Sequence, residues 1–256
     1  MIISNKYRIL NKLGEGNYGN VYIGEHIFLK KTVAIKISKE SENILLKNEA
    51  KIYKFLENTN GVPQMLLYGV EDSKCFVILD KLEYQLERNK NQDICNIGID
   101  MIKIIENIHN KGVIHRDIKP DNFMYKNGKL YLLDYGLATM YLDNGEIHKP
   151  ENKISNIIGS INYISVNVHK YILPSRRDDI ESIIYVLFYL YNKLEWENLT
   201  EIEIKNKKYN LLYNFNVEEI KYDNILCILY KLLIYIRNLN YVDKPDYNYM
   251  YKQLKD

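Results

Sequence analysis

The sequence predicts an α+β fold with two lobes: a small five-stranded antiparallel sheet with one helix, followed by a larger, mainly helical part. Short runs of alternating apolar and polar residues, separated by turn residues, occupy much of the first 80 positions on either side of Ser41–Glu57 and indicate strands joined as hairpins. After residue 83, apolar residues recur three or four positions apart, which is typical of amphipathic helices. We therefore expect a single domain over residues 1–256, with an N-terminal lobe at 1–80, a hinge at 81–83 and a C-terminal lobe at 84–256.

The composition is that of an ordinary globular chain, with 46% hydrophobic residues, 27% charged residues and a net charge of +2. Such a small charge predicts neither a nucleic-acid partner nor a membrane surface. The longest apolar run, Ile183–Tyr191, is well short of the roughly 18 residues that a membrane span needs. Three separated cysteines, Cys75, Cys95 and Cys227, lack the spacing of a disulfide framework and indicate a reducing compartment. We expect a monomer in the cytoplasm or nucleus.

Strands are expected at Tyr7–Leu13, Val21–Phe28 and Thr32–Ile37, and the first two enclose a glycine-rich turn. Glycine at positions 14, 16 and 19 would let the backbone of this turn lie close to a ligand, because glycine has no side chain. A dinucleotide-binding fold is excluded because its glycines open a helix, whereas these lead into a second strand. Alternation along the third strand places Lys36 on the same face as Ala34.

A helix is expected at Ser41–Glu57, with Ser41 as its N-cap and Glu49 within an otherwise apolar stripe. Lys36 is the expected partner of Glu49, since a buried carboxylate without a cation is strongly destabilising. Taken alone, Glu49 could equally be a solvated charge. The remaining strands are expected at Met65–Val70 and Cys75–Leu79, and the remaining helices at Asp93–Lys111, Asp178–Lys193, Thr200–Lys207, Val217–Asn238 and after Pro245.

The stretch Val113–Gly136 places polar residues at fixed offsets between short apolar runs. A loop that leaves a buried strand can aim carboxylates while the strands fix their positions, and catalytic groups concentrate in such loops. Each aspartate taken singly has a simpler interpretation as a turn former. Together with the glycine turn, Lys36 and Glu49, however, they supply the residue types that phosphoryl transfer needs. The polar residues in question are Asp117, Lys119, Asn122 and Asp134.

His115-Arg116-Asp117 with Asn122 five residues later, followed by Asp134-Tyr135-Gly136, resembles the catalytic core of eukaryotic-type protein kinases. The resemblance implies the two-lobed protein kinase fold and transfer of the ATP γ-phosphate with Mg²⁺. It implies that Asp117 orients the substrate hydroxyl, while Lys119 and Lys36 contact phosphates. It further implies that Asn122 and Asp134 bind Mg²⁺. The other implied ATP-binding residues are Leu13, Gly14, Glu15, Gly16, Gly19, Val21, Ala34, Glu49, Leu79 as gatekeeper, Asp80, Leu82 in the hinge, Met124 and Leu133 or its neighbour Leu132.

Lys119 matches the H-R-D-x-K-x-x-N pattern of serine/threonine kinases. The segments Gly159–Asn167, Ser175–Ser182 and Asp243–Tyr247 resemble the casein kinase 1 family, in which S-I-N replaces the usual A-P-E. The chain is accordingly identified as similar to this family, whose members are non-specific serine/threonine protein kinases, so protein substrates with Ser or Thr in an acidic context are expected. By the same resemblance, Asp179 would brace the catalytic loop.

Two departures from the family pattern affect these expectations. Tyr135 replaces the phenylalanine of D-F-G, as in the vaccinia-related kinases, and activity is expected to survive. Asn162 replaces the arginine that helps to bind pre-phosphorylated substrates in the family, and Ile204 stands near the place of a second basic residue. Because Asn cannot replace a bidentate arginine, a preference for such substrates is left open. The cations that could compensate are Lys205, Lys207 and Arg176.

Two other functions are compatible with parts of this pattern. A pseudokinase would act as a binding or scaffold module, but the intact Lys36, Asp117 and Asp134 argue against it. A small-molecule phosphotransferase of the aminoglycoside-kinase type shares the H-x-D-x-x-x-x-N loop but would lack the Ser175–Ser182 motif. The heavy use of Ile, Asn, Lys and Tyr is typical of AT-rich genomes, such as those of protists and large DNA viruses. For a viral protein we would expect the host cell cytoplasm or the virion.

Overall fold

The computed structural model describes residues 1–16, 19–39, 42–212 and 223–255, which form two compact units. Unit 1 comprises Met1–Gln85 and Phe123–Ala138, and unit 2 comprises Leu86–Asn122 and Thr139–Asp256. Unit 1 thus includes a segment, Phe123–Ala138, that the sequence places in the C-terminal lobe. The predicted α+β class with an antiparallel N-terminal sheet is confirmed.

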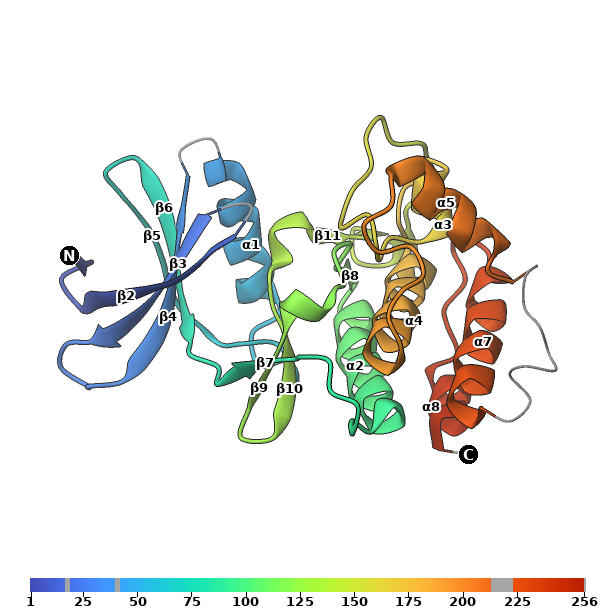
Figure 1. Ribbon diagram of the computed structural model, residues 1–256. Helices are drawn as coiled ribbons and strands as arrows, with labels where there is room; N and C mark the ends of the chain where they lie inside the picture. Colours follow the sequence, from blue (N-terminus) through green and yellow to red (C-terminus); the bar gives the residue numbers. More distant parts are fainter. Residues whose placement is uncertain (17–18, 40–41, 213–222, 256) are drawn as a thin grey trace. The chain divides into compact units, whose positions relative to one another are not determined.

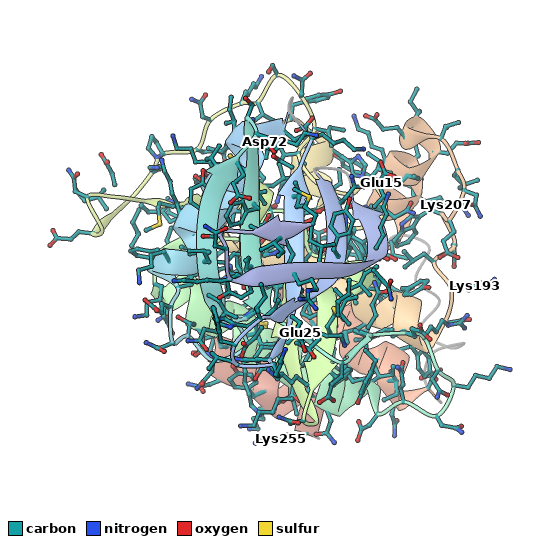
Figure 2. All side chains as sticks on the ribbon, turned by 90° about the vertical axis from the view of Figure 1, so that its left-hand side faces the viewer. Glu15, Glu25, Asp72, Lys193, Lys207 and Lys255 are labelled. Carbon is teal, nitrogen blue, oxygen red and sulfur yellow. The ribbon has the colours of Figure 1, made fainter. Side chains whose placement is uncertain are left out.

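Unit 1 is built on an antiparallel sheet with the strand order β1-β2-β3-β4-β6-β5 (Figure 1). It has six strands rather than the predicted five, because Ile2–Ile3 pairs with the start of β2 through Ile2 opposite Arg8. The strands are β1 (Ile2–Ile3), β2 (Tyr7–Gly16), β3 (Gly19–His26), β4 (Thr32–Ser38), β5 (Met65–Glu71) and β6 (Lys74–Asp80). Asp72 marks the turn between β5 and β6 at one end of this sheet (Figure 2).

The two faces of this sheet differ in chemistry. One face contributes an apolar core formed by Ile3, Tyr7, Val33, Ile35, Phe76 and Ile78. Because side chains alternate along a strand, Ala34 and Lys36 of β4 lie on the opposite face. The strand register places Leu79 opposite Ala34 and Val21 opposite Lys36, so these residues share that face. The alternation in β4 therefore separates the core of unit 1 from the predicted ATP-binding residues.

One helix and a smaller sheet complete unit 1. Helix α1 (Asn43–Phe55) is preceded by Glu42 at the N-cap position, and the predicted cap Ser41 lies outside the described residues. The smaller sheet has the order β10-β9-β7, and the short helix η3 follows β10. Their bounds are β7 (Tyr84–Gln85), β9 (Phe123–Lys126), β10 (Lys129–Leu132) and η3 (Tyr135–Leu137).

Unit 2 is mainly helical (Figure 1). Helix α2 packs against α4 and α8, and helix α7 packs against the same two helices. Side chains cap the helix starts: Asp93 accepts from Asn96 N at α2, and Asp223 accepts from Leu226 N at α7. The helices are α2 (Ile94–Asn110), α3 (Val166–His169), α4 (Arg176–Tyr191), α5 (Glu201–Asn210), α7 (Asn224–Arg237) and α8 (Tyr247–Lys255).

Short elements connect these helices, and they are β8 (Val113–Ile114), η2 (Pro120–Asn122), β11 (Thr139–Met140), β12 (Leu142–Asp143) and β13 (Ile147–His148). The predicted helices of this unit are present within a few residues of their expected bounds. The first part of the predicted helix Val217–Asn238 lies outside the described residues. Within the described ranges, no helix combines the length and apolar character needed to cross a bilayer.

Candidate active site

The first candidate group, here named the Lys36 cluster, consists of Lys36 on β4, Glu49 on α1 and Asp134 after β10, all within unit 1. The Nζ atom of Lys36 lies 2.7 Å from Glu49 Oε2 and 3.0 Å from Asp134 Oδ1. The Glu49 side chain is only 2% exposed and that of Lys36 11%. The predicted pairing of Lys36 with Glu49 is therefore confirmed.

Burial and charge act in opposite directions within the Lys36 cluster. Burial alone would lower the pKa of the Lys36 ammonium, but the Glu49 and Asp134 carboxylates outweigh it and raise that pKa above its ordinary value. Burial raises the pKa of the Glu49 carboxyl to about 7, against the attraction of Lys36. Lys36 therefore stays charged near neutral pH, which suits a group that binds phosphate.

Helix α1 also fixes the segment that carries Asp134. The Nδ2 atom of Asn48 donates to the carbonyl oxygens of Gly136 and Ala138, each at 3.0 Å. The hydroxyl of Tyr53 accepts a hydrogen bond from the Asp134 backbone N–H at 3.3 Å, and the Tyr53 and Tyr135 rings meet edge to face at 5.0 Å. These contacts hold Asp134 at φ +62°, which is uncommon for a residue other than glycine.

The sequence did not point to Asn48 or Tyr53 as functional residues. Tyr53 follows Glu49 by four residues and therefore lies on the same side of the helix. This spacing is the only sequence signal that could have indicated a role for Tyr53 at the site. Asn48 follows no recognisable pattern. Its role depends on where the backbone after Asp134 lies, which a single sequence does not give.

The chemistry of Asp134 fits a magnesium ligand. Its carboxylate offers hard oxygen atoms, which Mg²⁺ prefers, and its side chain is 24% exposed while those of its two partners are more deeply buried. Asn122, in unit 2, offers an amide oxygen of the same hard type. Its Nδ2 atom donates to the carbonyl oxygen of Asp117 at 2.8 Å, so the amide group is oriented by the loop itself. The metal-binding roles of both residues stay predictions.

The residues predicted to surround the adenine ring all belong to unit 1, although they come from five strands and two connecting segments. Leu79 and Leu82 are buried, whereas Leu13 is 55% exposed. The carbonyl oxygen of Leu82 accepts from Lys81 Nζ at 3.1 Å. Val21 on β3, Ala34 on β4, Met124 on β9 and Leu133 after β10 are partly buried. Their contacts with a nucleotide stay predictions.

Besides the Lys36 cluster, two more carboxylates of the predicted nucleotide site, Glu15 and Asp80, form ion pairs with lysines. Glu15 lies 2.8 Å from Lys39 and 3.2 Å from Lys12, and its pKa is lowered by the hydrogen bonds from these lysines. The Asp80 carboxylate lies 2.6 Å from Lys31 and 3.3 Å from Lys126. The carboxylates of both residues therefore tie strands and turns of unit 1 together in this structure.

The glycine turn joins β2 to β3. Gly14 pairs with Val21 and Gly16 with Gly19 across the two strands, and positions 17 and 18 at the tip lie outside the described residues. A Cβ atom on Gly19 would overlap the carbonyl oxygen of Ile37. Glycine is therefore required at position 19 for the close approach of β3 to β4.

The second candidate group, here named the Asp117 cluster, lies in unit 2 and contains Asp117, Lys119, Asn122 and Ser160. The Oδ1 atom of Asp117 accepts from the Ser160 hydroxyl at 2.7 Å and from its backbone N–H at 2.9 Å. Lys119 Nζ lies 3.0 Å from Asp117 Oδ2 and donates to Ser160 Oγ at 3.2 Å. A buried carboxylate thus receives a hydroxyl donor while an ammonium group lies beside both.

Ser160 lies in the segment Gly159–Asn167, which stands out in the sequence only for its family resemblance. Its contact with Asp117 joins positions 43 residues apart, so no local pattern could have revealed it. The preceding Gly159 has φ +98°, and a Cβ atom there would overlap the carbonyl oxygen of Arg116. Glycine at 159 thus permits the close approach that brings Ser160 to Asp117.

Asp179 on α4 braces the loop before Asp117. Its carboxylate accepts from the backbone N–H groups of His115 at 2.7 Å and Arg116 at 2.8 Å, which confirms the predicted bracing role. Burial alone would raise the pKa of Asp179, but the hydrogen bonds that its carboxylate accepts from His109 and from the loop backbone lower it. The ionised carboxylate holds Arg116 at φ +69°, an uncommon conformation for this residue type.

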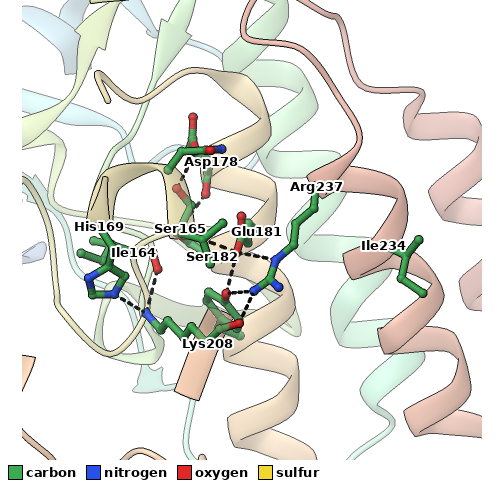
Figure 3. A network of polar contacts seen from close by, with 12 residues as sticks. Ile164, Ser165, His169, Asp178, Glu181, Ser182, Lys208, Ile234 and Arg237 are labelled. Carbon is green, nitrogen blue, oxygen red and sulfur yellow. Dashed lines mark hydrogen bonds and ion pairs between the residues drawn. The ribbon is translucent and has the colours of Figure 1, made fainter. Parts of the chain in front are cut away.

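Lys208 on α5 holds the segment that follows Ser160. Its Nζ atom is fully buried and donates to the carbonyl oxygens of Ile161 at 2.9 Å and Ile164 at 2.7 Å. Figure 3 shows the Lys208 side chain directed at Ile164 and His169. The indole N–H of Trp196 donates to the Asn162 carbonyl oxygen at 3.0 Å. The backbone from Ile161 to Ile164 is therefore fixed by side chains from other parts of unit 2.

The cations expected to compensate for Asn162 differ in their surroundings. Arg176 is wrong as a candidate, because it is buried, lies over the Tyr141 ring and donates to Tyr141 and to the Val242 carbonyl oxygen. Lys207 is exposed on α5 and lies 3.6 Å from Glu195 (Figure 2). Ile204 is buried on the same helix.

A comparison with protein-family models agrees with this geometry. The model described as the protein kinase domain matches residues 7–227. The match contains both the Lys36 cluster and the Asp117 cluster, and it ends before α8.

Proposed function

The chain belongs to the protein kinase family, and from this premise we propose that it is a serine/threonine protein kinase similar to casein kinase 1. Members of the protein kinase family use ATP with Mg²⁺. In our proposal the γ-phosphate of ATP passes to Ser or Thr hydroxyls of protein substrates in an acidic context. The reaction requires positioned charges and an oriented hydroxyl more than covalent chemistry by the protein.

The observation that carries this proposal is the geometry of the Asp117 cluster. A carboxylate that already accepts a serine hydroxyl at 2.7 Å can orient the hydroxyl of a substrate in the same way. Lys119, 3.0 Å from that carboxylate, would stabilise negative charge that develops on the transferred phosphoryl group. Lys119 also belongs to the sequence pattern that distinguishes serine/threonine kinases from tyrosine kinases.

The Lys36 cluster supports ATP as the phosphate donor. Lys36 carries a positive charge that the α and β phosphates would attract, and Glu49 holds its ammonium group in place. Asp134 and Asn122 have the oxygen donors that suit Mg²⁺. When bound, the metal ion would neutralise charge on the phosphates. The turn between β2 and β3 would cover them with backbone N–H groups.

The experiment that tests the proposal is transfer of radiolabelled phosphate from ATP to casein and acidic peptides, with Asp134→Asn as the inactive control. We expect incorporation on Ser and Thr by the wild type and none above background by the control. Incorporation mainly on Tyr would contradict the serine/threonine assignment. A folded wild-type protein that transfers no more phosphate than the control would instead support a pseudokinase that acts as a binding module.

Substrate preference follows from the surroundings of Asn162. Position 162 carries no arginine that could bind a phosphate group through two hydrogen bonds. Arg176 already donates hydrogen bonds to the Tyr141 hydroxyl and the Val242 carbonyl oxygen. We therefore expect matched phosphorylated and unphosphorylated peptides to be used with kcat/KM values within about threefold of each other, since a lost charge-assisted contact is not replaced. A large advantage of the phosphopeptide would show that another cation takes the place of the missing arginine.

A further inference from the structure

The motif Asp243–Tyr247 marks the family resemblance in the sequence but has no role in the chemistry above. In the structure, Tyr247 begins α8 and is 3% exposed. Its hydroxyl oxygen lies 2.7 Å from His109 Nδ1 at the end of α2, and this contact is buried. A buried tyrosine hydroxyl needs a partner, and here the partner is a histidine ring that is itself 1% exposed.

The other nitrogen of the His109 ring contacts the brace of the catalytic loop. His109 Nε2 lies 3.1 Å from Asp179 Oδ2. An ionised carboxylate can only accept hydrogen bonds, so Nε2 must carry the proton. Burial lowers the pKa of His109, which favours a neutral ring with a bare Nδ1. The Tyr247 hydroxyl therefore donates to Nδ1 and stabilises the one tautomer that can also donate to Asp179.

Asp179 links the His109 ring to the backbone beside Asp117. The same Oδ2 atom that contacts His109 accepts from His115 N–H at 2.7 Å, and Oδ1 accepts from Arg116 N–H at 2.8 Å. Because Arg116 has an unfavourable positive φ, its conformation depends on such bonds. The hydrogen-bonded series thus runs from Tyr247 through His109 and Asp179 to the residue that precedes Asp117.

The His109 ring nitrogens contact Tyr247 and Asp179, whereas a different residue fixes the His109 backbone. The Tyr141 hydroxyl donates to the carbonyl oxygen of His109 at 2.7 Å. This bond holds the main chain at the end of α2 but does not select a ring tautomer. Besides the two tyrosines, the titratable groups that face the ring are Asp179 and Arg176 on α4 and His115 in the loop.

We propose that Tyr247 is a positioning residue for the catalytic loop, acting through His109 and Asp179 on the backbone that carries Asp117. The inference rests on the proposed function in one respect, namely that Asp117 orients the substrate hydroxyl. It gives the C-terminal helix α8 a part in catalysis, although α8 lies outside the segment that matches the kinase family model.

The test compares Tyr247→Phe with Tyr251→Phe in the whole chain. Tyr251 is a matched control, because it lies on the same helix and its hydroxyl donates to Glu106 Oε2 on α2 at 2.6 Å, away from the loop. In Tyr247→Phe we expect amide exchange at His115 and Arg116 to rise about tenfold relative to the other amides of unit 2. We also expect kcat to fall about fivefold with the KM for ATP unchanged. Tyr251→Phe should show neither effect.

Unchanged exchange at His115 and Arg116 in Tyr247→Phe would overturn the inference. An equal rise in both variants would also overturn it, since the hydroxyl would then act only through general stability. If the wild type transferred no phosphate, the proposed function would fail, but exchange would still decide whether Tyr247 orders the loop.

Discussion

Lys36 in unit 1 and Lys208 in unit 2 are both largely shielded from solvent, and the two lysines differ in what surrounds them. Lys36 in unit 1 lies 2.7 and 3.0 Å from two carboxylates, and its pKa is raised. Lys208 in unit 2 donates to two backbone carbonyl oxygens, and burial lowers its pKa well below the ordinary value. Glu181 opposes this decrease, while the charge of Arg237 adds to it (Figure 3).

The difference shows that burial alone does not determine what a lysine contributes. Carboxylate partners keep Lys36 charged, so it can attract phosphate at any pH near neutral. The hydrogen bonds of Lys208 go to carbonyl oxygens and not to a carboxylate that would stabilise its ammonium form, so its contribution is structural. The proposed function of Lys36 therefore depends on its charge. For Lys208, the hydrogen bonds that its Nζ atom donates fix the conformation of Ile161–Ile164.

The largest effect should come from Lys36→Met, which keeps an unbranched side chain and removes the charge. We expect phosphate transfer to fall by about 100-fold or more, because a preorganised cation near the phosphates is lost. The melting temperature should change little, since Glu49 can become protonated when its partner is absent. The measurement is kcat with casein together with a thermal denaturation curve. A variant that keeps a tenth or more of wild-type turnover would remove Lys36 from the catalytic residues.

Lys208→Met should have the opposite profile. We expect a loss of about 2 kcal/mol in the free energy of unfolding, because two buried carbonyl oxygens lose their donor. The KM for ATP should stay within about twofold of wild type, because the predicted ATP-binding residues other than Lys119 and Asn122 lie in unit 1. Chemical denaturation and ATP kinetics measure these two quantities. The matched control is Lys207→Met on the same helix, where the exposed side chain should make no difference.

A smaller effect is expected in the pH dependence of the Lys36 cluster. Burial raises the pKa of Glu49 to about 7, so Glu49 gains a proton and loses its ion pair with Lys36 as the pH falls through that value. The kcat/KM for ATP should therefore decrease on the acid side with a midpoint near this pH. Because the folded state binds this proton more tightly than the unfolded state, stability should decrease as the pH rises from the ordinary carboxyl pKa to the raised one.

The control for this pH dependence is Glu49→Gln, which cannot titrate. We expect it to have lower activity than wild type, since a neutral amide holds the ammonium group less firmly. Its kcat/KM for ATP should no longer show the acid decrease near that pH. An identical decrease in Glu49→Gln would assign the titration to a different group and would weaken the contrast between the two lysines.

The sequence predicted those parts of the fold and site that depend on local patterns. Alternation along β4 placed Lys36, the apolar stripe of α1 placed Glu49, and the loop motif placed Asp117 and Asn122. The additional strand β1 was missed because two residues give no periodicity. Ser160 and Lys208 were missed as partners of the site because their contacts join residues 39 or more positions apart. Such contacts depend on packing, which a single sequence does not specify.

Helix α1 has a consequence beyond the ion pair that it contributes. Within four helical turns it presents Asn48, Glu49 and Tyr53, and these residues hold both the ammonium of Lys36 and the backbone from Asp134 to Ala138. A displacement of α1 would therefore break the ion pair between Glu49 and Lys36. It would also break the hydrogen bonds that hold the backbone from Asp134 to Ala138. Control exerted through this helix would therefore act on the phosphate-binding cation and on the predicted metal ligand together.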